Sequence, residues 1–305
     1  MVNQRNDAGT SFSCGYVAII GRPNVGKSTL LNQLLGQKIS ITAHKPQTTR
    51  HRILGINNAD KAQIIYVDTP GIHGTAREAL NRYMNRAAMS SLIDVDVVIF
   101  VVEALSWNDQ DDFVLGKLSQ SNVPVILAVN KVDKIKRKDD LLPYLQQLSS
   151  KMNFAAVVPL SARTGDSVMA LQEEVIQRLP QSAPFFPEDQ VTDRSERFLA
   201  AEFIREKLMR SLGQELPYAL TVEIERFEDK ENLKRISAII WVSRPGQKAI
   251  IIGKQGSRLK NIGEQARKDM ERAFECKVFL QLWVKVKQGW SDDEKALRSL
   301  GYTDD

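Results

Sequence analysis

The chain has 305 residues, enough for two domains, and its apolar and charged fractions of 43% and 26% are those of an ordinary globular protein. The net charge of +5 and a pI near 9.1 favour a polyanionic partner. Two distant cysteines, Cys14 and Cys276, exclude a cysteine-rich zinc site and predict a reducing compartment. No apolar run is long enough to span a membrane. Residues 1–15 are polar and lack the apolar core of a signal peptide, so they predict a disordered N-terminal arm.

Between residues 16 and 180, strand-like apolar runs alternate with helical patterns. Strands are expected at 16–20, 50–56, 63–68, 96–102, 125–130 and 155–160. Helices are expected at 27–35, 77–91, 111–119, 141–152 and 167–179. The run 97–102 is apolar on both faces, as in a central strand of a covered sheet. This alternation predicts a doubly wound α/β domain that binds its ligand at the carboxyl ends of the strands.

The first predicted strand leads into a glycine-containing loop with a lysine and hydroxyl residues. It reads Gly21-Arg22-Pro23-Asn24-Val25-Gly26-Lys27-Ser28-Thr29. Gly21 and Gly26 let successive backbone N–H groups point at phosphate oxygens, and the following helix adds its positive end. Lys27 is expected to bind the β- and γ-phosphates, and the Ser28 hydroxyl to ligate Mg²⁺. The strand–loop–helix order favours a phosphate-binding loop over a turn without a ligand.

A second loop, Asp68-Thr69-Pro70-Gly71, follows the strand 63–68. Asp68 is expected to hold Mg²⁺ through a water molecule, and the Gly71 N–H to approach the γ-phosphate. The same four residues also suit a plain turn. Their place roughly 40 residues after a phosphate loop favours the nucleotide role.

Two further loops predict which base is bound. In Asn130-Lys131-Val132-Asp133, the carboxylate of Asp133 can accept two hydrogen bonds from guanine N1 and N2, a pair that adenine does not offer. Asn130 either bonds the base or braces the phosphate loop, and the Lys131 stem lies along the ring. In Ser161-Ala162-Arg163, a backbone N–H is expected to meet guanine O6. The predicted ligands are therefore GTP and GDP with Mg²⁺.

The polar segment 36–50 lies between the phosphate loop and Asp68. A threonine in such a segment can ligate Mg²⁺ only when the γ-phosphate is present, which makes an order–disorder switch. We favour Thr49 over Thr48, because Arg50 is expected to open the next strand. The alternative is a surface loop with a serine/threonine turn.

Three prolines at 180, 184 and 187 predict an extended linker. The expected domains are therefore 16–180, the linker 181–192, and 193–305. Phe185 and Phe186 are expected to pin the linker to a domain surface.

The second domain is expected to run helix 198–212, strands 219–227 and 233–242, two helices, and strand 277–287. Between the two helices stands Gly253-Lys254-Gln255-Gly256, the G-x-x-G signature of a KH domain, which clamps a single-stranded RNA backbone. Arg258 and Lys260 follow it, and residues 244–287 hold eleven basic and four acidic residues, as an RNA surface requires. The predicted fold is thus a doubly wound P-loop domain followed by a smaller α+β domain.

The four loops together resemble the translation-factor-related P-loop GTPases. Within them, Gly21–Thr29 and Asp68–Ile72 are similar to the Era family. The resemblance extends over almost the whole chain through Thr192-Asp193-Arg194, Arg205-Glu206-Lys207-Leu208, Leu216-Pro217-Tyr218, 222–227, 266–270 and 282–287. It implies a type II KH topology and slow hydrolysis of GTP to GDP and phosphate.

The resemblance also implies a role in assembly of the small (30S) ribosomal subunit. The implied partner is the single-stranded 3′ region of 16S rRNA, and the GTP state would control its engagement. The family further implies a cytoplasmic monomer with a fraction bound peripherally to the inner membrane.

The catalytic group is less fully specified by the sequence. Lys27, Gly71 and Thr49 are the expected catalytic residues. Ile72 stands where Ras-like proteins place the glutamine that orients water, and an isoleucine cannot do so by hydrogen bonding. In some relatives a K⁺ ion is held through the residue equivalent to Asn24, which makes K⁺ a hypothesis here.

Two other functions compete with a GTP-driven RNA-binding factor. A phosphotransferase acting on a small molecule is disfavoured by Asn130 and Asp133 and by the lack of a lid-type arginine cluster. A pure RNA-binding protein with a vestigial nucleotide fold is disfavoured by Lys27, Ser28 and Asp68.

Overall fold

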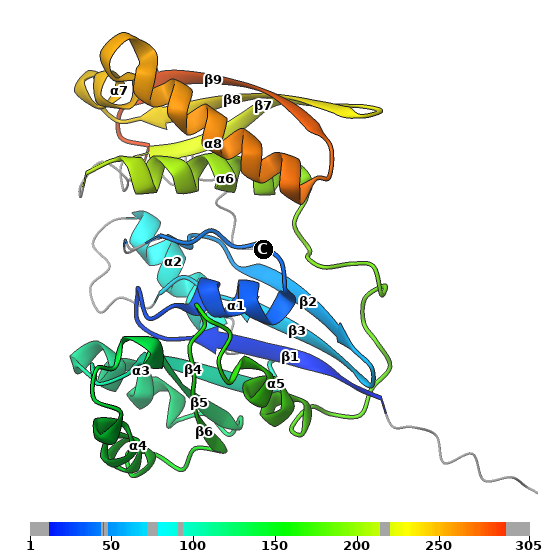
Figure 1. Cartoon of the computed structure of the whole chain (residues 1–305), viewed down its shortest axis with the longest axis vertical. Coiled ribbons are helices and arrows are strands. Elements are labelled where there is room, and N and C mark those ends of the chain that lie inside the picture. Colours follow the sequence, from blue (N-terminus) through cyan, green and yellow to red (C-terminus); the bar gives the residue numbers. More distant parts are fainter. Residues whose placement is uncertain are drawn as a thin grey trace, which may run out of the picture.

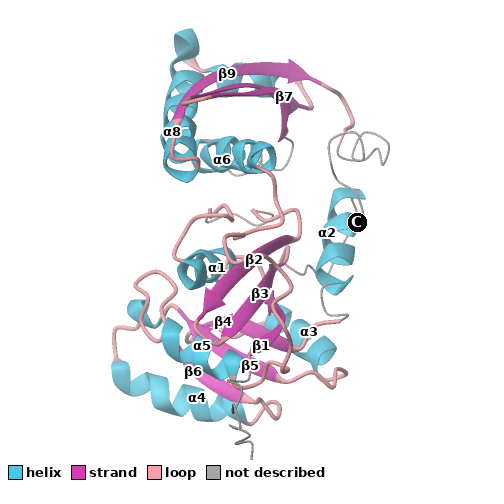
Figure 2. Cartoon of the chain, turned by 90° about the vertical axis from the view of Figure 1, so that its right-hand side faces the viewer, coloured by secondary structure: helices cyan, strands magenta, loops and turns pink. Residues whose placement is uncertain are grey.

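A computed structural model describes residues 12–43, 45, 48–71, 79–90, 94–213 and 220–290. Two domains are stacked along the long axis of the molecule (Figure 1). The first is built on a six-stranded sheet and the second on a three-stranded sheet. The first helix of the second domain lies between the small sheet and the first domain, as both views show (Figures 1 and 2).

The large sheet has the strand order β2-β3-β1-β4-β5-β6. Its strands are β1 (Ser13–Ile20), β2 (Ile53–Ala59), β3 (Ala62–Asp68), β4 (Val97–Glu103), β5 (Val125–Asn130) and β6 (Ala156–Pro159). All neighbours pair in parallel except β2, which runs antiparallel to β3 at the edge. β3 and β5 are buried along their whole length, because helices cover both faces of a doubly wound sheet.

The helices of the first domain are α1 (Lys27–Leu35), α2 (Ala79–Ser90), α3 (Asp109–Leu118), α4 (Leu141–Ser149) and α5 (Val168–Ile176). Apolar side chains of α1 and α5 share one hydrophobic core with β1, β3 and β4. Those of α2, α3 and α4 share a second core with the opposite face of the sheet. The predicted doubly wound α/β fold is therefore confirmed.

The second domain contains α6 (Glu196–Ser211), β7 (Leu220–Lys230), β8 (Leu233–Val242), α7 (Pro245–Ile252), α8 (Ser257–Ala273) and β9 (Lys277–Val286). β7 pairs antiparallel with β8, and β9 pairs parallel with β8. Side chains of the three helices and the inner sheet face form a single core. The predicted α+β domain and its helix-first order are confirmed. None of the described helices is long and apolar enough to cross a membrane.

The predicted starts of two strands in the first domain are wrong by three residues, and the helices predicted at 141–152 and 167–179 end earlier, at Ser149 and Ile176. Strand β1 begins at Ser13, so residues 13–15 are not part of an N-terminal arm. Ser13 to Gly15 pair with β3, and Cys14 is fully buried. Strand β2 begins at Ile53 and not at residue 50, because the Arg50 side chain is buried and donates to the Leu220 carbonyl of the second domain (2.8 Å).

The linker is extended and attached to the first domain. The backbone N–H groups of Phe185 and Phe186 donate to Gln63 Oε1 at 2.7 and 2.9 Å. The Phe185 ring stacks on Tyr16 with centroids 5.7 Å apart. The prediction that both phenylalanines pin the linker to a domain surface is therefore confirmed.

Candidate nucleotide site and RNA loop

The phosphate loop encloses the ammonium group of Lys27. Helix α1 begins at this residue, after Gly26 with φ of 106°. A Cβ on Gly26 would lie 2.3 Å from Asn130 Nδ2, so glycine is required here. Lys27 Nζ donates to the carbonyl oxygens of Gly21 (2.9 Å) and Arg22 (3.0 Å). Burial lowers the pKa of Lys27 to about 8, although nearby Asp68 raises it.

Four oxygen-bearing side chains, those of Ser28, Ser40, Thr49 and Asp68, meet next to this lysine. Ser28 Oγ lies 2.8 Å from Thr49 Oγ1 and donates to Asp68 Oδ2 at 2.8 Å. Ser40 Oγ also donates to Asp68 Oδ2 at 2.8 Å. Burial raises the pKa of Asp68, opposed by the Ser40 hydrogen bond and by Lys27. Among the described residues, buried Asp68 Oδ1 has no hydrogen-bond partner. Two hydroxyls and a carboxylate with a spare oxygen suit Mg²⁺, which prefers oxygen ligands.

The two adjacent threonines differ in what they contact. Thr49 is buried and its hydroxyl reaches Ser28. The hydroxyl of Thr48 instead donates to the carbonyl oxygen of Lys45 at 2.6 Å. Of the two threonines, Thr49 is therefore the one whose hydroxyl lies beside Ser28, while Thr48 is bonded within its own segment.

Asn130 ties the base loop to its neighbours. Its Nδ2 donates to the Val25 carbonyl of the phosphate loop (2.8 Å). Its Oδ1 accepts from the backbone N–H groups of Lys131 (2.7 Å) and Ala162 (2.9 Å). Of the two roles considered for Asn130, the structure shows the bracing one.

Asp133 is held as an ionised acceptor. Ser161 Oγ donates to its Oδ1 at 2.7 Å, and Arg163 forms an ion pair with its Oδ2 at 2.6 Å. The Ser161 hydrogen bond, followed by the Arg163 charge, holds the pKa of Asp133 below its usual range. A carboxylate of this kind can accept the two N–H groups of a guanine edge.

Lys131 crosses from the base loop to the phosphate loop. It has a left-handed backbone (φ 69°), and its Nζ lies 2.7 Å from both the Asn24 carbonyl oxygen and Glu103 Oε2. Asn24 is also left-handed (φ 65°) and exposed. Lys131 therefore joins the base loop to the phosphate loop and to Glu103 at the end of β4.

A cavity of about 500 Å³ lies at the phosphate loop and reaches Lys131 of the base loop, whereas Asp68, Asn130, Asp133 and Ser161 do not line it. Its lining from the first domain is Pro23, Asn24, Gly26, Lys27, Ser28, Thr29, Ile41, Thr42, Ala43, Lys45, Thr48, Thr49, Gly71 and Lys131. Two further lining residues, Met209 and Arg210, belong to α6 of the second domain. The first domain's nucleotide cavity therefore has a wall supplied by the second.

Several predicted residues do not turn their side chains toward this cavity. Arg22 points to α3, where its Nε donates to Asp111 Oδ2 at 2.9 Å. Val25 is fully buried in the core, and Thr69 Oγ1 donates to the Ile19 carbonyl oxygen. These three can serve the nucleotide through their backbones only. Ile72 lies outside the described residues.

The predicted RNA loop is an exposed turn between α7 and α8. Gly253, Gln255 and Gly256 have φ of 71°, 51° and 77°, and a Cβ on Gly253 would lie 2.8 Å from Arg258 Cβ. The side chains of Lys254 and Gln255 are exposed. Arg258 Nη1 donates to the Ile250 carbonyl (2.7 Å), and Lys260 is exposed on α8. The turn thus offers close backbone approach and positive charge.

Sequence reasoning missed Ser40 and six residues that line the cavity, namely Ile41, Thr42, Ala43, Lys45, Met209 and Arg210. Ser40 could have been suspected as a hydroxyl in the polar segment 36–50. Met209 and Arg210 follow an ordinary helical pattern, and no local signal places them beside a loop some 180 residues earlier in the chain.

Known proteins resemble the chain over its full length. Residues 16–131 match the 50S ribosome-binding GTPase family, and residues 215–291 match the KH domain family. The GTPase Era of Pseudomonas aeruginosa is 58% identical over 304 residues, covering 100% of both chains. The chain belongs to the Era family of GTPases.

Two solved structures agree with this membership. A variant of Era from Aquifex aeolicus bound to GDP and AlF4⁻ matches with a TM-score of 0.92 and 40% identity, covering 96% of this chain and 100% of that one. Era in complex with MgGDPNP and nucleotides 1506–1542 of 16S ribosomal RNA matches equally well, over 96% and 99% of the two chains. The predicted GTP hydrolysis, P-loop fold and KH domain are therefore confirmed.

Proposed function

We propose that this GTPase acts in assembly of the small (30S) ribosomal subunit by binding the single-stranded 3′ region of 16S rRNA, and that its GTP state controls this binding. The observation that carries the proposal is the shared cavity, in which Met209 and Arg210 of the second domain line the nucleotide site of the first. The relative that holds MgGDPNP together with a 16S fragment supports the same pairing of ligands.

The roles of the nucleotide residues follow from their contacts. Lys27 binds phosphate oxygens through its ammonium group. The same group donates to the carbonyl oxygens of Gly21 and Arg22 in the phosphate loop. Ser28 and Thr49 ligate Mg²⁺ directly, and Asp68 does so through water. The Gly71 N–H meets the γ-phosphate, and Asp133 binds guanine. The bound Mg²⁺ would neutralise charge on the phosphates during hydrolysis.

K⁺ is a proposed second cation at Asn24. The residue is exposed, left-handed and on the wall of the cavity, so an amide oxygen is at hand there. Such a monovalent ion would supply a positive charge, which the apolar side chain of Ile72 cannot supply. GTP hydrolysis that is faster in K⁺ than in Na⁺ would support this role, and equal rates would contradict it.

In the RNA-binding domain, the Gly253–Gly256 turn clamps the RNA backbone, with Lys254, Arg258 and Lys260 beside it. We divide the chain into a G domain to residue 180, a linker 181–192 and a KH domain from residue 193. We also propose a cytoplasmic monomer with a peripheral inner-membrane fraction, which sizing and cell fractionation would test.

The choice of ribosomal RNA is open to a direct experiment. Binding of a 16S fragment spanning nucleotides 1506–1542 is compared with binding of a 23S fragment of equal length, at fixed salt, because phosphate contacts make affinity salt-dependent. The proposal expects the 16S fragment to bind at least tenfold more tightly. Equal affinities, or tighter binding of the 23S fragment, would overturn it.

A further inference from the structure

The described residues of the segment 38–50 (38–43, 45 and 48–50) contact both domains and contribute to both cores. Ile39 packs in the core of the first domain, whereas Ile41 packs in the core of the second. Asn32 of α1 fixes the segment to the first domain, because its Oδ1 accepts the N–H groups of Ile39 and Ser40 at 3.0 Å. The segment is therefore anchored beside the phosphate loop at its start.

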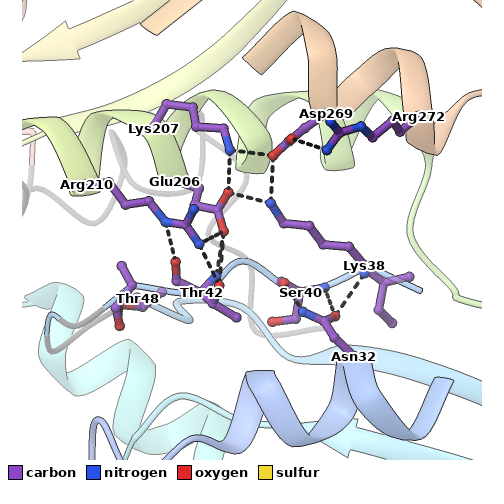
Figure 3. Close-up of polar contacts among 12 residues, drawn as sticks. Asn32, Lys38, Ser40, Thr42, Thr48, Glu206, Lys207, Arg210, Asp269 and Arg272 are labelled. Atoms are coloured by element: carbon purple, nitrogen blue, oxygen red, sulfur yellow. Dashed lines mark hydrogen bonds and ion pairs between the residues drawn. The ribbon is translucent and has the colours of Figure 1, made fainter. Parts of the chain in front are cut away.

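A buried carboxylate of α6 fixes the same stretch to the second domain (Figure 3). Glu206 is fully buried, and its Oε1 accepts from the Thr42 N–H (2.9 Å) and from Arg210 (3.0 Å). Its Oε2 accepts from Lys38 (2.5 Å). Asp269 of α8 pairs with Lys38 as well, at 2.8 Å. Residues 38–42 thus lie against α6 through charge-assisted hydrogen bonds, which are stronger than neutral ones.

The later part of the segment meets α6 through Arg205. The guanidinium of Arg205 donates to both oxygens of Glu202, at 2.7 and 2.6 Å, and to the carbonyl oxygen of Thr48. The side chains of Arg205 and Glu202 are only 2% and 7% exposed. The ion pair therefore presents a rigid, desolvated donor to the Thr48 carbonyl, which a solvated side chain could not do.

The bonded carbonyl belongs to the same peptide plane as the amide of Thr49. Because that plane is rigid, the bond from Arg205 fixes the direction in which the chain enters Thr49. The hydroxyl of Thr49 then lies 2.8 Å from Ser28 Oγ, among the proposed Mg²⁺ ligands. On the other side, Arg50 donates to Leu220 of the second domain. The two residues next to Thr49 in the chain, Thr48 and Arg50, are therefore both hydrogen-bonded to the second domain.

We infer that helix α6 of the RNA-binding domain positions Thr49 for Mg²⁺, and that Arg205 is the positioning residue. The inference rests on the proposed function, which assigns Thr49 as a Mg²⁺ ligand in the GTP state. It gives the second domain a specific part in GTP hydrolysis, since a shift of α6 moves the peptide that carries a metal ligand.

The test replaces Arg205 and compares it with a neighbour of equal burial. Arg205→Met removes the bond to Thr48, whereas Lys207→Met removes a buried cation of the same helix (6% exposed) whose ion pairs go to Glu206 and Asp269. The Mg²⁺ concentrations for half-maximal binding of GDPNP and for half-maximal GTP hydrolysis are both expected to rise about tenfold in Arg205→Met, which corresponds to the loss of one charge-assisted hydrogen bond. In Lys207→Met both concentrations should change less than twofold. GDP affinity should be unchanged in both variants.

Thr49→Ala and the double variant separate a positioning role from a structural one. Thr49→Ala should raise the Mg²⁺ requirement, and adding Arg205→Met should then cause no further rise, because both act on one ligand. Arg205→Lys, which can replace only part of the bidentate fork, should give an intermediate value and serves if Arg205→Met does not fold.

The outcomes show separately whether the positioning role of Arg205 fails and whether the assignment of Thr49 as a Mg²⁺ ligand fails. If Thr49→Ala raises the Mg²⁺ requirement but Arg205→Met and Arg205→Lys do not, the positioning role is overturned and the metal site stands. If the effects of Thr49→Ala and Arg205→Met simply add, Arg205 acts elsewhere and the inference is also overturned. If Thr49→Ala has no effect, the metal assignment itself is wrong.

Discussion

The side-chain amide of Asn130 donates to the carbonyl oxygen of Val25 at 2.8 Å and so joins the base loop to the phosphate loop. Replacing Asn130 by alanine removes this bond and leaves the buried Val25 carbonyl unsatisfied, which costs about 1–3 kcal/mol. Asn130→Ala should therefore lower both the free energy of unfolding and the affinity for GDP.

The control is Asn57→Ala, because Asn57 makes a similar 2.8 Å bond to Leu34 away from the cavity. Urea unfolding should show a loss in both variants, and GDP titration a loss in Asn130→Ala alone. Equal GDP affinity in the two variants would contradict the bracing role.

The identity of the base is tested at Asp133. Asp133→Asn replaces an acceptor by an amide that donates, which suits the C2 oxygen of xanthine and not the N2 amino group of guanine. The affinity for GTP should fall at least about tenfold, and that for xanthosine triphosphate should rise. Competition between the two nucleotides measures this directly, and unchanged GTP affinity would show that another residue reads the base.

Nucleotide binding should take up a proton at alkaline pH. The pKa of Lys27 is about 8 in the free protein, because burial opposes the charged form, and bound phosphates restore that charge. GDP binding should therefore take up a proton, and this uptake should be larger at pH 8.5 than at pH 7.5. Calorimetry in buffers of different ionisation enthalpy measures this uptake. No uptake at pH 8.5, or affinity that does not weaken as the pH rises above 8, would contradict the placement of Lys27.

His51 should make the fold less stable in acid. Burial lowers its pKa to about 4 from 6.5, opposed by the charge of Glu202. Its contribution to stability is present above pH 6.5 and is lost as the pH falls toward 4, because only the unfolded chain then binds the proton. The side chain is partly accessible, so the loss should be at most about 2 kcal/mol. His51→Gln should remove that part of the pH dependence in urea unfolding, and identical pH profiles would refute it.

The RNA clamp is tested by charge reversal on the exposed turn. Lys254→Asp combined with Gln255→Asp keeps both glycines and sets two carboxylates against phosphates, each costing on the order of 1–3 kcal/mol. Affinity for single-stranded RNA at low salt should fall at least about tenfold. The matched control is Lys117→Asp with Gln110→Asp, the same charge change on exposed positions of α3. Loss of affinity in both double variants would indicate a general charge effect, and loss in neither would exclude the turn.

The sequence predicts those elements whose required residues stand next to one another in the chain. Position 26 must be glycine because Asn130 leaves no room for a Cβ. The glycine is part of the local G-x-x-x-x-G-K-S pattern, so the phosphate loop could be predicted from the sequence. Strand ends were placed less well where distant contacts decide them. Strand β2 starts late because Arg50 leaves the sheet to reach Leu220. The roles of Met209 and Arg205 depend on how the two domains stack, and no pattern within helix α6 specifies that arrangement.

The central claim is that the guanine nucleotide in the first domain controls RNA binding by the second. The most direct measurement is the affinity of the full chain for a 16S fragment spanning nucleotides 1506–1542 with GDPNP and then with GDP, at fixed Mg²⁺ and salt. We predict at least about fivefold tighter binding with GDPNP, equivalent to a coupling free energy of about 1 kcal/mol. Equal affinities in the two nucleotide states would contradict the account.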